Sequence, residues 1–149
     1  SLEQTLNETK DNVKTAIMNL LDTINEPVLS KVADLASELA ETLYYVDKAG
    51  LWNELLVKAY AFVETSDENK IQTGLTIYNF LFVHLANELQ STMISLLKFS
   101  KPLTDPNLNV AASALAAVSN YLTIAPSKYT LAYLPCLEGM VSVPLRALE

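Results

Sequence analysis

The feature that most constrains this chain is an internal repeat with a period of 39 residues. Three apolar helical runs open at Val32, Ile71 and Val110, each 39 residues after the one before. The stretches between these runs keep the same spacing, since Val13 aligns with Trp52. Self-similarity at such a period predicts an array of stacked helix pairs. An array of this kind works by presenting a surface, so the sequence directs the search to binding partners.

Composition agrees with a helical chain that binds proteins. Half of the 149 residues are hydrophobic and only three are glycine, which suits a helical fold with a sizeable core. The net charge of -7 argues against nucleic-acid binding, because contacts to phosphates need a basic surface. An acidic surface permits binding to basic proteins and equally serves plain solubility. Cys136 is the only cysteine, which excludes an internal disulfide and fits a reducing compartment.

Apolar spacing and helix breakers predict seven helices. They cover residues 2–24, 27–46, 51–64, 67–85, 87–100, 106–124 and a stretch from 127 onward. We expect an N-cap within residues 65–68 before the fourth helix, and Asp105 as the N-cap of the sixth helix with Pro106 as its first residue. Pro135 is expected to kink the seventh helix or to delay its start. The fourth helix is apolar nearly all round, which predicts a middle layer of the stack.

The predicted helices alternate between two layers, with the first of each pair called an A helix and the second a B helix. The expected core stripe of the first B helix is Val32, Leu35, Leu39, Leu43 and Val46. Along the A helices, the spacing aligns Ala16 with Leu55 and Ile17 with Leu56. A helices would form one face of a curved solenoid and B helices the other.

An uncharged stretch from Pro106 to Ser127 is long enough to span a membrane. It holds several Asn, Ser and Thr residues and a proline near each end, so we interpret it as a buried helix. The first four residues are polar and helical, and no signal peptide is expected. Because the chain starts and stops inside helical patterns, we expect residues 1–149 to be one array, part of a longer solenoid.

No catalytic or metal-binding constellation is recognisable. His84 has neither a second metal ligand nor triad partners at a known spacing, so it is interpreted as a histidine at a helix end. Glu38 and Glu41 could form a carboxylate pair, but a solvated helix face is favoured. Cys136 is expected to be buried, and Trp52 to pack between repeats rather than to anchor a partner. The sequence therefore predicts neither an enzyme nor a cofactor or metal.

The junction at residues 105–115 resembles that of HEAT repeats. It reads Asp-Pro-Asn-Leu-Asn-Val-Ala-Ala-Ser-Ala-Leu, and in HEAT repeats an Asp-Pro precedes a Val-Arg and then an Ala. Here Ala33, Gln72 and Ala111 occupy the position of the arginine, so the usual arginine–aspartate ladder between repeats lacks its cation. The period of 39 is slightly below the usual range of about 40–47 residues. The resemblance implies an all-α superhelix of about three and a half HEAT pairs.

Residues 31–40 read Lys-Val-Ala-Asp-Leu-Ala-Ser-Glu-Leu-Ala, and residues 51–56 read Leu-Trp-Asn-Glu-Leu-Leu. These two segments are similar to the N-terminal part of the importin-beta (karyopherin-beta) superfamily, closest to its importin 5 branch. That branch has a Lys-Val-x-Asp-x-x-x-Glu-Leu-Ala helix followed by Trp-Pro-Glu-Leu-Leu. Asn53 replaces its proline.

This resemblance implies a nuclear transport receptor of the cytoplasm and nucleus. Receptors of the superfamily bind Ran-GTP through the B-helix face, basic protein cargo farther along it, and Phe-Gly nucleoporins between A helices. Neither direct nucleic-acid binding nor membrane insertion is implied. The expected partner-binding residues are polar positions of the B helices, each with an alternative as a solvated residue: Lys31, Asp34, Glu38, Glu41, Thr73 and Asn120. Tyr60 and Phe99 are candidates for a nucleoporin groove between the second and third A helices.

Two other functions fit the same sequence. A HEAT-repeat scaffold or adaptor would have the same fold without a nucleotide-dependent partner. A helical domain attached to an enzyme would need catalytic residues outside this chain.

Overall fold

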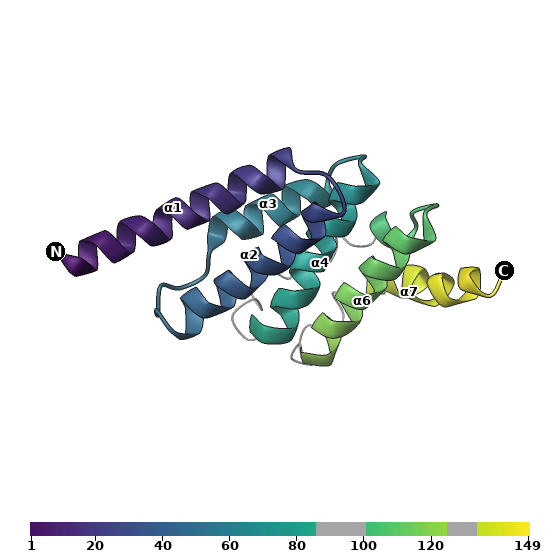
Figure 1. Ribbon diagram of the computed structural model, residues 1–149. Coiled ribbons are helices and arrows are strands. Elements are labelled where there is room, and N and C mark those ends of the chain that lie inside the picture. Colours follow the sequence, from purple (N-terminus) through teal and green to yellow (C-terminus); the bar gives the residue numbers. More distant parts are fainter. Residues whose placement is uncertain (86–100, 125–133) are drawn as a thin grey trace.

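The computed structural model describes residues 1–85, 101–124 and 134–149, and the regular structure in these ranges is helical (Figure 1). Its helices are α1 (Leu2–Thr23), α2 (Val28–Tyr45), α3 (Asn53–Val63), α4 (Glu68–Leu85), α6 (Leu108–Ile124) and α7 (Leu134–Ala147). The prediction of an all-α HEAT-type solenoid is confirmed. The helix predicted over 87–100 lies outside the described residues.

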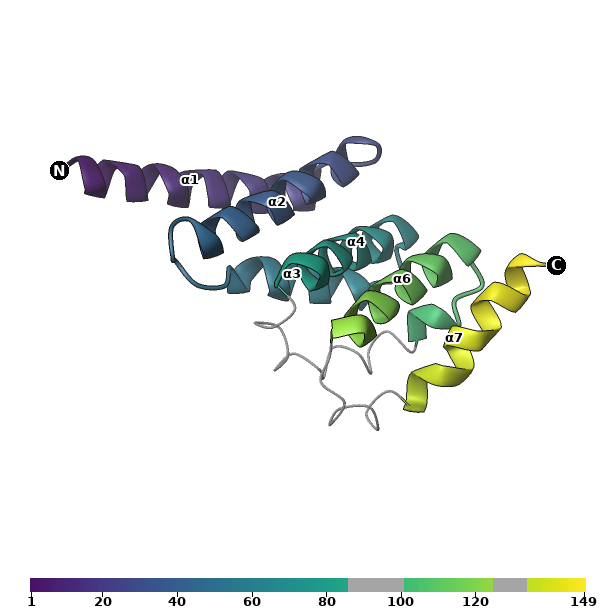
Figure 2. The same cartoon turned by 90° about the horizontal axis from the view of Figure 1, so that it is seen from below.

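The helices form two layers, as the alternation of A and B helices predicts. The B helices α2, α4 and α6 lie side by side, with α4 in contact with both of its neighbours (Figures 1 and 2). The A helices α1 and α3 each pack on the B helix that follows them, and α7 packs on α6. The expectation that the fourth helix is the middle layer is confirmed, because α4 contacts α2, α3 and α6.

The period of the sequence is visible as a period of burial along the B helices. Three sets of residues spaced by 39 are buried: Val32, Ile71 and Val110; Ala36, Leu75 and Ala114; Leu43, Phe82 and Tyr121. The last set joins neighbouring pairs through aromatic contact, since the rings of Phe82 and Tyr121 lie 5.0 Å apart at 66°. Edge-to-face geometry of this kind adds to the stabilisation from buried area. The repeat thus places equivalent side chains in one continuous core.

Side-chain caps fix where two of the B helices begin. The Asp67 carboxylate accepts hydrogen bonds from the backbone N–H groups of Asn69 and Lys70, at 2.9 and 3.3 Å. The N-cap predicted within residues 65–68 is therefore confirmed, and Asp67 supplies it. The predicted start of α6 at Pro106 is wrong. Asp105 accepts from the Asn107 N–H, while the Asn107 side chain accepts from the Asn109 N–H and caps a helix that begins at Leu108. Two successive Asx turns delay the helix, because each supplies the backbone with a partner outside it.

The predicted core stripe of α2 is partly wrong. Leu35 and Val46 remain 53% and 72% exposed, although Val32 and Leu43 of the same stripe are buried. The buried face of α2 also includes Leu29, Ala33, Ala36, Ser37 and Ala40. The buried face of α2 is therefore the one that contacts α4, and it consists largely of alanine and serine.

The A helices do not share one register. Leu55 is buried, but Ala16, which lies 39 residues earlier, is exposed. Ile17 is buried, whereas its counterpart Leu56 is half-buried. Helix α1 is thus turned about its axis relative to α3, and Leu6, Val13 and Leu20 on it remain exposed.

One glycine explains why the second helix pair is tighter than the first. A Cβ atom on Gly74 of α4 would lie 2.6 Å from the Ala59 carbonyl oxygen of α3, so only glycine permits this approach. Leu35 stands 39 residues before Gly74 in α2. The leucine at this position cannot support so close an approach, and its side chain stays 53% exposed.

Helix α7 is held against the start of α6 by a basic side chain. The Arg146 guanidinium donates to the carbonyl oxygens of Asp105 and Pro106, at 2.6 and 3.1 Å. Pro135 lies in the first turn of α7, where its missing N–H leaves no helical hydrogen bond unmade. The predicted earlier part of this helix, from residue 127, lies outside the described residues.

The uncharged stretch forms α6, in which Val110, Ala111, Ala114, Val118 and Tyr121 are buried against the stack. Among the described helices, none is both long and apolar enough to cross a membrane.

Candidate partner-binding face

Three of the expected partner-binding residues lie exposed on α2. Lys31, Asp34 and Glu38 all stand on the side of this helix turned away from the core. Glu41, one turn farther along, is half-buried and makes a contact of its own. The helix thus offers a short row of charges of both signs, at positions that folding does not use.

Two other expected residues are placed differently. Thr73 is only 3% exposed, and its hydroxyl donates to the Asn69 carbonyl oxygen at 2.7 Å, so its prediction as a surface residue is wrong. The cause is the middle position of α4, whose flank toward α2 is covered. Asn120 is half-buried, and its amide donates to the side-chain oxygen of Asn79, which joins α6 to α4.

The aromatic candidates are only partly described. Tyr60 is half-buried on α3, while Phe99 lies outside the described residues, and so does the groove predicted between them. Trp52 is 4% exposed and lies under the Lys14 ammonium, whose nitrogen is 5.5 Å from the ring centre. The interpretation of Trp52 as a packing residue between repeats is confirmed. A hollow of about 390 Å³ beside it is bordered by α1, including Asp11 and Met18.

Two hollows on the B-helix face were not predicted. One, of about 340 Å³, is lined by Glu26, Ser30, Ala33, Gln72, Thr73, Thr76 and Ser113. The other, of about 270 Å³, is lined by Leu75, Thr76, Asn79, Ala112, Ser113 and Ala116. Thr76 and Ser113 belong to both, so the hollows adjoin and cross all three B helices. We call this pair the B-face groove.

A signal for this groove was present in the sequence. Gln72, Thr76 and Asn79 are polar residues at positions i, i+4 and i+7 of an otherwise apolar helix, which places them along one side of α4. Ser113 and Asn120 repeat the pattern on the uncharged α6. This spacing indicates that the polar residues share one side of the helix, but it does not indicate that a groove lies there.

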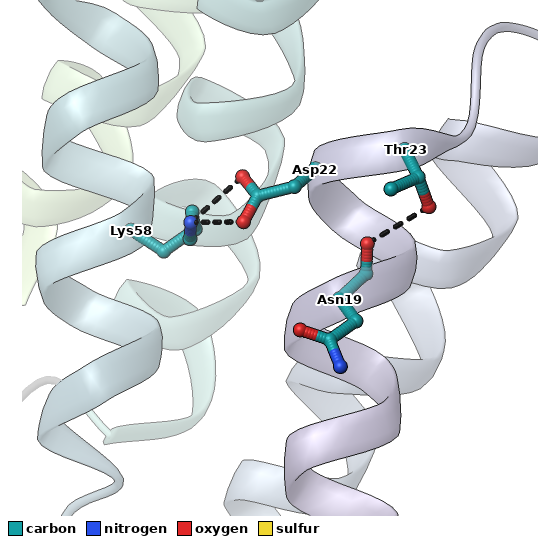
Figure 3. A network of polar contacts seen from close by, with 4 residues as sticks. All are labelled: Asn19, Asp22, Thr23 and Lys58. Carbon is teal, nitrogen blue, oxygen red and sulfur yellow. Dashed lines mark hydrogen bonds and ion pairs between the residues drawn. The ribbon is translucent and has the colours of Figure 1, made fainter.

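Polar contacts between repeats replace the missing arginine–aspartate ladder. The Asn107 amide donates to a Glu68 carboxylate oxygen at 2.6 Å, and these residues lie 39 apart. On the A side, the Lys58 ammonium of α3 donates to both carboxylate oxygens of Asp22 of α1 at 2.7 Å (Figure 3). In the same view, the Thr23 hydroxyl donates to the Asn19 carbonyl and closes the last turn of α1.

The remaining chemical candidates belong to the core or to undescribed positions. Cys136 is buried as predicted, and burial raises the pKa of its thiol, which keeps it protonated at neutral pH. His84 belongs to α4, but its side chain lies outside the described residues. Within the described ranges, no three His, Cys, Asp or Glu side chains gather in a way that could hold a metal ion.

Comparison with known proteins gives one match. A family model described as "IPO5-like, TPR repeats" matches residues 24–147, which include α2, α3, α4, α6 and α7. No curated protein and no solved structure matches the chain.

Proposed function

The chain belongs to the importin-5-like repeat family, and we propose that it is part of a nuclear transport receptor. Importin-type repeat proteins are generally non-enzymatic and bind protein partners. The observation that carries the proposal is the extent of the family match, which begins before α2 and includes every described B helix. The partners we propose are Ran-GTP, basic protein cargo and Phe-Gly nucleoporins, with the protein moving between cytoplasm and nucleus.

The proposed mechanism is binding and release without any covalent step. Ran-GTP would dock on the B-helix face, with Lys31, Asp34 and Glu38 of α2 available for charged contacts because they are exposed. Since each helix pair contacts chiefly its neighbours, a partner that changes the angle between pairs alters the curvature of the whole face. Cargo held by that face then loses its fit, which couples Ran binding to release.

The test is a calorimetric titration of the chain with Ran carrying a non-hydrolysable GTP analogue, beside Ran-GDP, at physiological salt. We expect binding to the GTP form alone. Equal binding to both forms would contradict the receptor proposal. Absence of binding to either would favour the alternative, a HEAT-repeat scaffold for protein assembly, whose partners are indifferent to nucleotide.

A further inference from the structure

We propose that α1 is a self-association helix, which joins two copies of this chain as an antiparallel helix pair around a two-fold axis. The surface is an apolar row on α1 that we call the α1 seam: Leu2, Leu6, Thr9, Val13, Ala16 and Leu20. The proposed function assigns no partner to this surface, so the inference goes beyond that function and is tested independently of it.

Helix α1 lies outside the part of the chain that follows the family pattern. The importin-5-like match begins at residue 24, directly after α1 ends at Thr23. At 22 residues, α1 is also twice as long as α3, the A helix of the next pair, which has 11. Its N-terminal part projects beyond the turn between α2 and α3 (Figures 1 and 2). A helix that served only to cover α2 would not need this length, which points to a second contact.

The α1 seam has the spacing of a contact between two helices. Its six residues follow one another at intervals of four, three, four, three and four positions, as the a and d positions of a coiled coil do. All six are exposed, with Leu2 at 76% and Leu6 at 51%. The stack uses another side of α1, on which Ile17 and Leu21 are buried. The seam is therefore a surface that the fold of one copy leaves uncovered.

The order of large and small residues makes the seam complementary to itself. An antiparallel pair whose two-fold axis passes between Thr9 and Val13 brings each seam position of one copy against a seam position of the other. The facing pairs are Leu2 with Leu20, Leu6 with Ala16, and Thr9 with Val13. Large residues thus face small ones at the inner positions, which fills the contact evenly. A parallel pair would place Ala16 against Ala16 and leave a gap.

The polar groups in and beside the seam are compatible with such a contact. The Thr9 hydroxyl donates to the Thr5 carbonyl oxygen at 2.9 Å, so burial of Thr9 leaves its proton hydrogen-bonded. One flank of the seam is uncharged and consists of Thr5, Asn12 and Asn19. The other flank carries Glu3 and Lys10, which are of opposite sign. Two copies, each of net charge -7, can therefore meet here without a row of facing carboxylates.

Analytical ultracentrifugation of the chain tests the association. One helix pair buries less surface than a standard protein interface, so we expect a reversible dimer with a Kd on the order of 10 µM. Raising salt from about 0.05 to about 0.5 M should tighten the dimer at least about twofold, because salt screens the repulsion between acidic copies. A chain that stays monomeric at about 1 mM would overturn the proposal. Weaker association at high salt would show that ionic contacts join the copies and would overturn the apolar seam.

Matched variants locate the contact. Leu6→Glu, Val13→Glu places two carboxylates in the seam and should raise the Kd at least about tenfold. Both positions are exposed, so the variant should keep the circular dichroism of the parent. The control is Val57→Glu, Val141→Glu, at apolar residues that are 68% and 62% exposed on α3 and α7. Equal weakening by the two double variants would mean that added charge alone separates the copies, and would overturn the seam as the site.

Disulfide cross-linking tests the direction of the pair. Chains carrying Leu2→Cys, mixed with chains carrying Leu20→Cys, should form at least about fivefold more covalent dimer than either variant alone, because these positions face one another only between antiparallel copies. Cys136 is buried and gives the same background in every sample. Cross-linking of either variant alone to the extent of the mixture would show a parallel pair and would overturn the proposed arrangement.

Discussion

Position 74 shows how one residue sets the distance between two helices. Glycine is unfavourable inside a helix by about 1 kcal/mol relative to alanine, and Gly74 lies well within α4. Its cost is offset by the close approach of α3, whose Ala59 oxygen, Val63 side chain and Phe62 side chain lie 2.6, 3.0 and 3.1 Å from the position that a Cβ would take. Local propensity and packing therefore oppose one another at this residue, and packing prevails.

We predict that Gly74→Ala lowers the free energy of unfolding by about 1–3 kcal/mol, despite the gain in helix propensity. The nearest obstacle is a backbone oxygen, which cannot turn aside as a side chain can. Urea denaturation followed by circular dichroism measures the change. Thr76→Ala, at an exposed position of the same helix, is the control and should leave stability within about 0.5 kcal/mol. A stabilised Gly74→Ala variant would show that α3 and α4 are not in close contact.

Helix α1 is attached to the stack by fewer buried side chains than its length would suggest. It has 22 residues, but Ile17 and Leu21 are its buried hydrophobics. Two ion pairs hold it in place: Lys10 with Asp47 at 2.9 Å, and Asp22 with Lys58 at 2.7 Å. Exposed ion pairs contribute about 0–1 kcal/mol each, so α1 is the least firmly attached of the helices that the first two pairs contain.

We predict that backbone amides of α1 exchange with deuterium faster than those of α4. Raising the salt concentration from about 0.1 to about 1 M should increase this difference in exchange rate, because salt screens the two ion pairs. Lys58→Met, which keeps an apolar stem but removes the charge, should speed exchange in α1 by up to about fivefold. Lys31→Met, at an exposed lysine of α2, is the matched control and should leave α1 unchanged. Salt-independent exchange in α1 would show that apolar contacts hold this helix.

Element boundaries were predictable where the signal was local, and less so where it depended on neighbours. The starts of α2 and α4 follow from Pro27 and Asp67, because each of these residues influences the backbone next to it. The predicted start of α6 is wrong because both Asp105 and Asn107 can cap a helix, and residue spacing does not show which of them does so. The side of α1 that is buried depends on how this helix packs against α2, which no pattern within α1 records.

The candidate partner-binding face likewise has one part that its own sequence indicates and another that depends on how several helices pack together. The charged row of Lys31, Asp34 and Glu38 was predictable, because polar residues opposite an apolar stripe face solvent. The groove was not, since its hollows depend on how three helices are spaced. The prediction of Thr73 as a surface residue is wrong for a related reason, because spacing along α4 does not record how the helices packed against it cover its sides.

We predict that the double variant Glu38→Lys, Glu41→Lys folds like the parent and binds basic partners more weakly. It removes two negative and adds two positive charges, a net change of +4 on the B-helix face, while neither position belongs to the core. Thermal unfolding should shift little, and affinity for a basic cargo protein in an interaction assay should fall. Glu3→Lys, Glu8→Lys on the exposed outer part of α1 is the charge-matched control. A loss of fold in the first variant would place Glu41 in an essential contact.

The contacts between successive helix pairs limit how such a chain can change in length. Glu68 meets Asn107 and Asn79 meets Asn120, so each of these contacts joins one pair to the next. Duplication or excision of one complete unit would keep the buried apolar positions in register, because they recur every 39 residues, whereas gain or loss of a few residues inside a helix would put both flanking junctions out of step. Proteins of this design can therefore lengthen or shorten by whole modules, and variation within a module is confined to substitutions and to its turns.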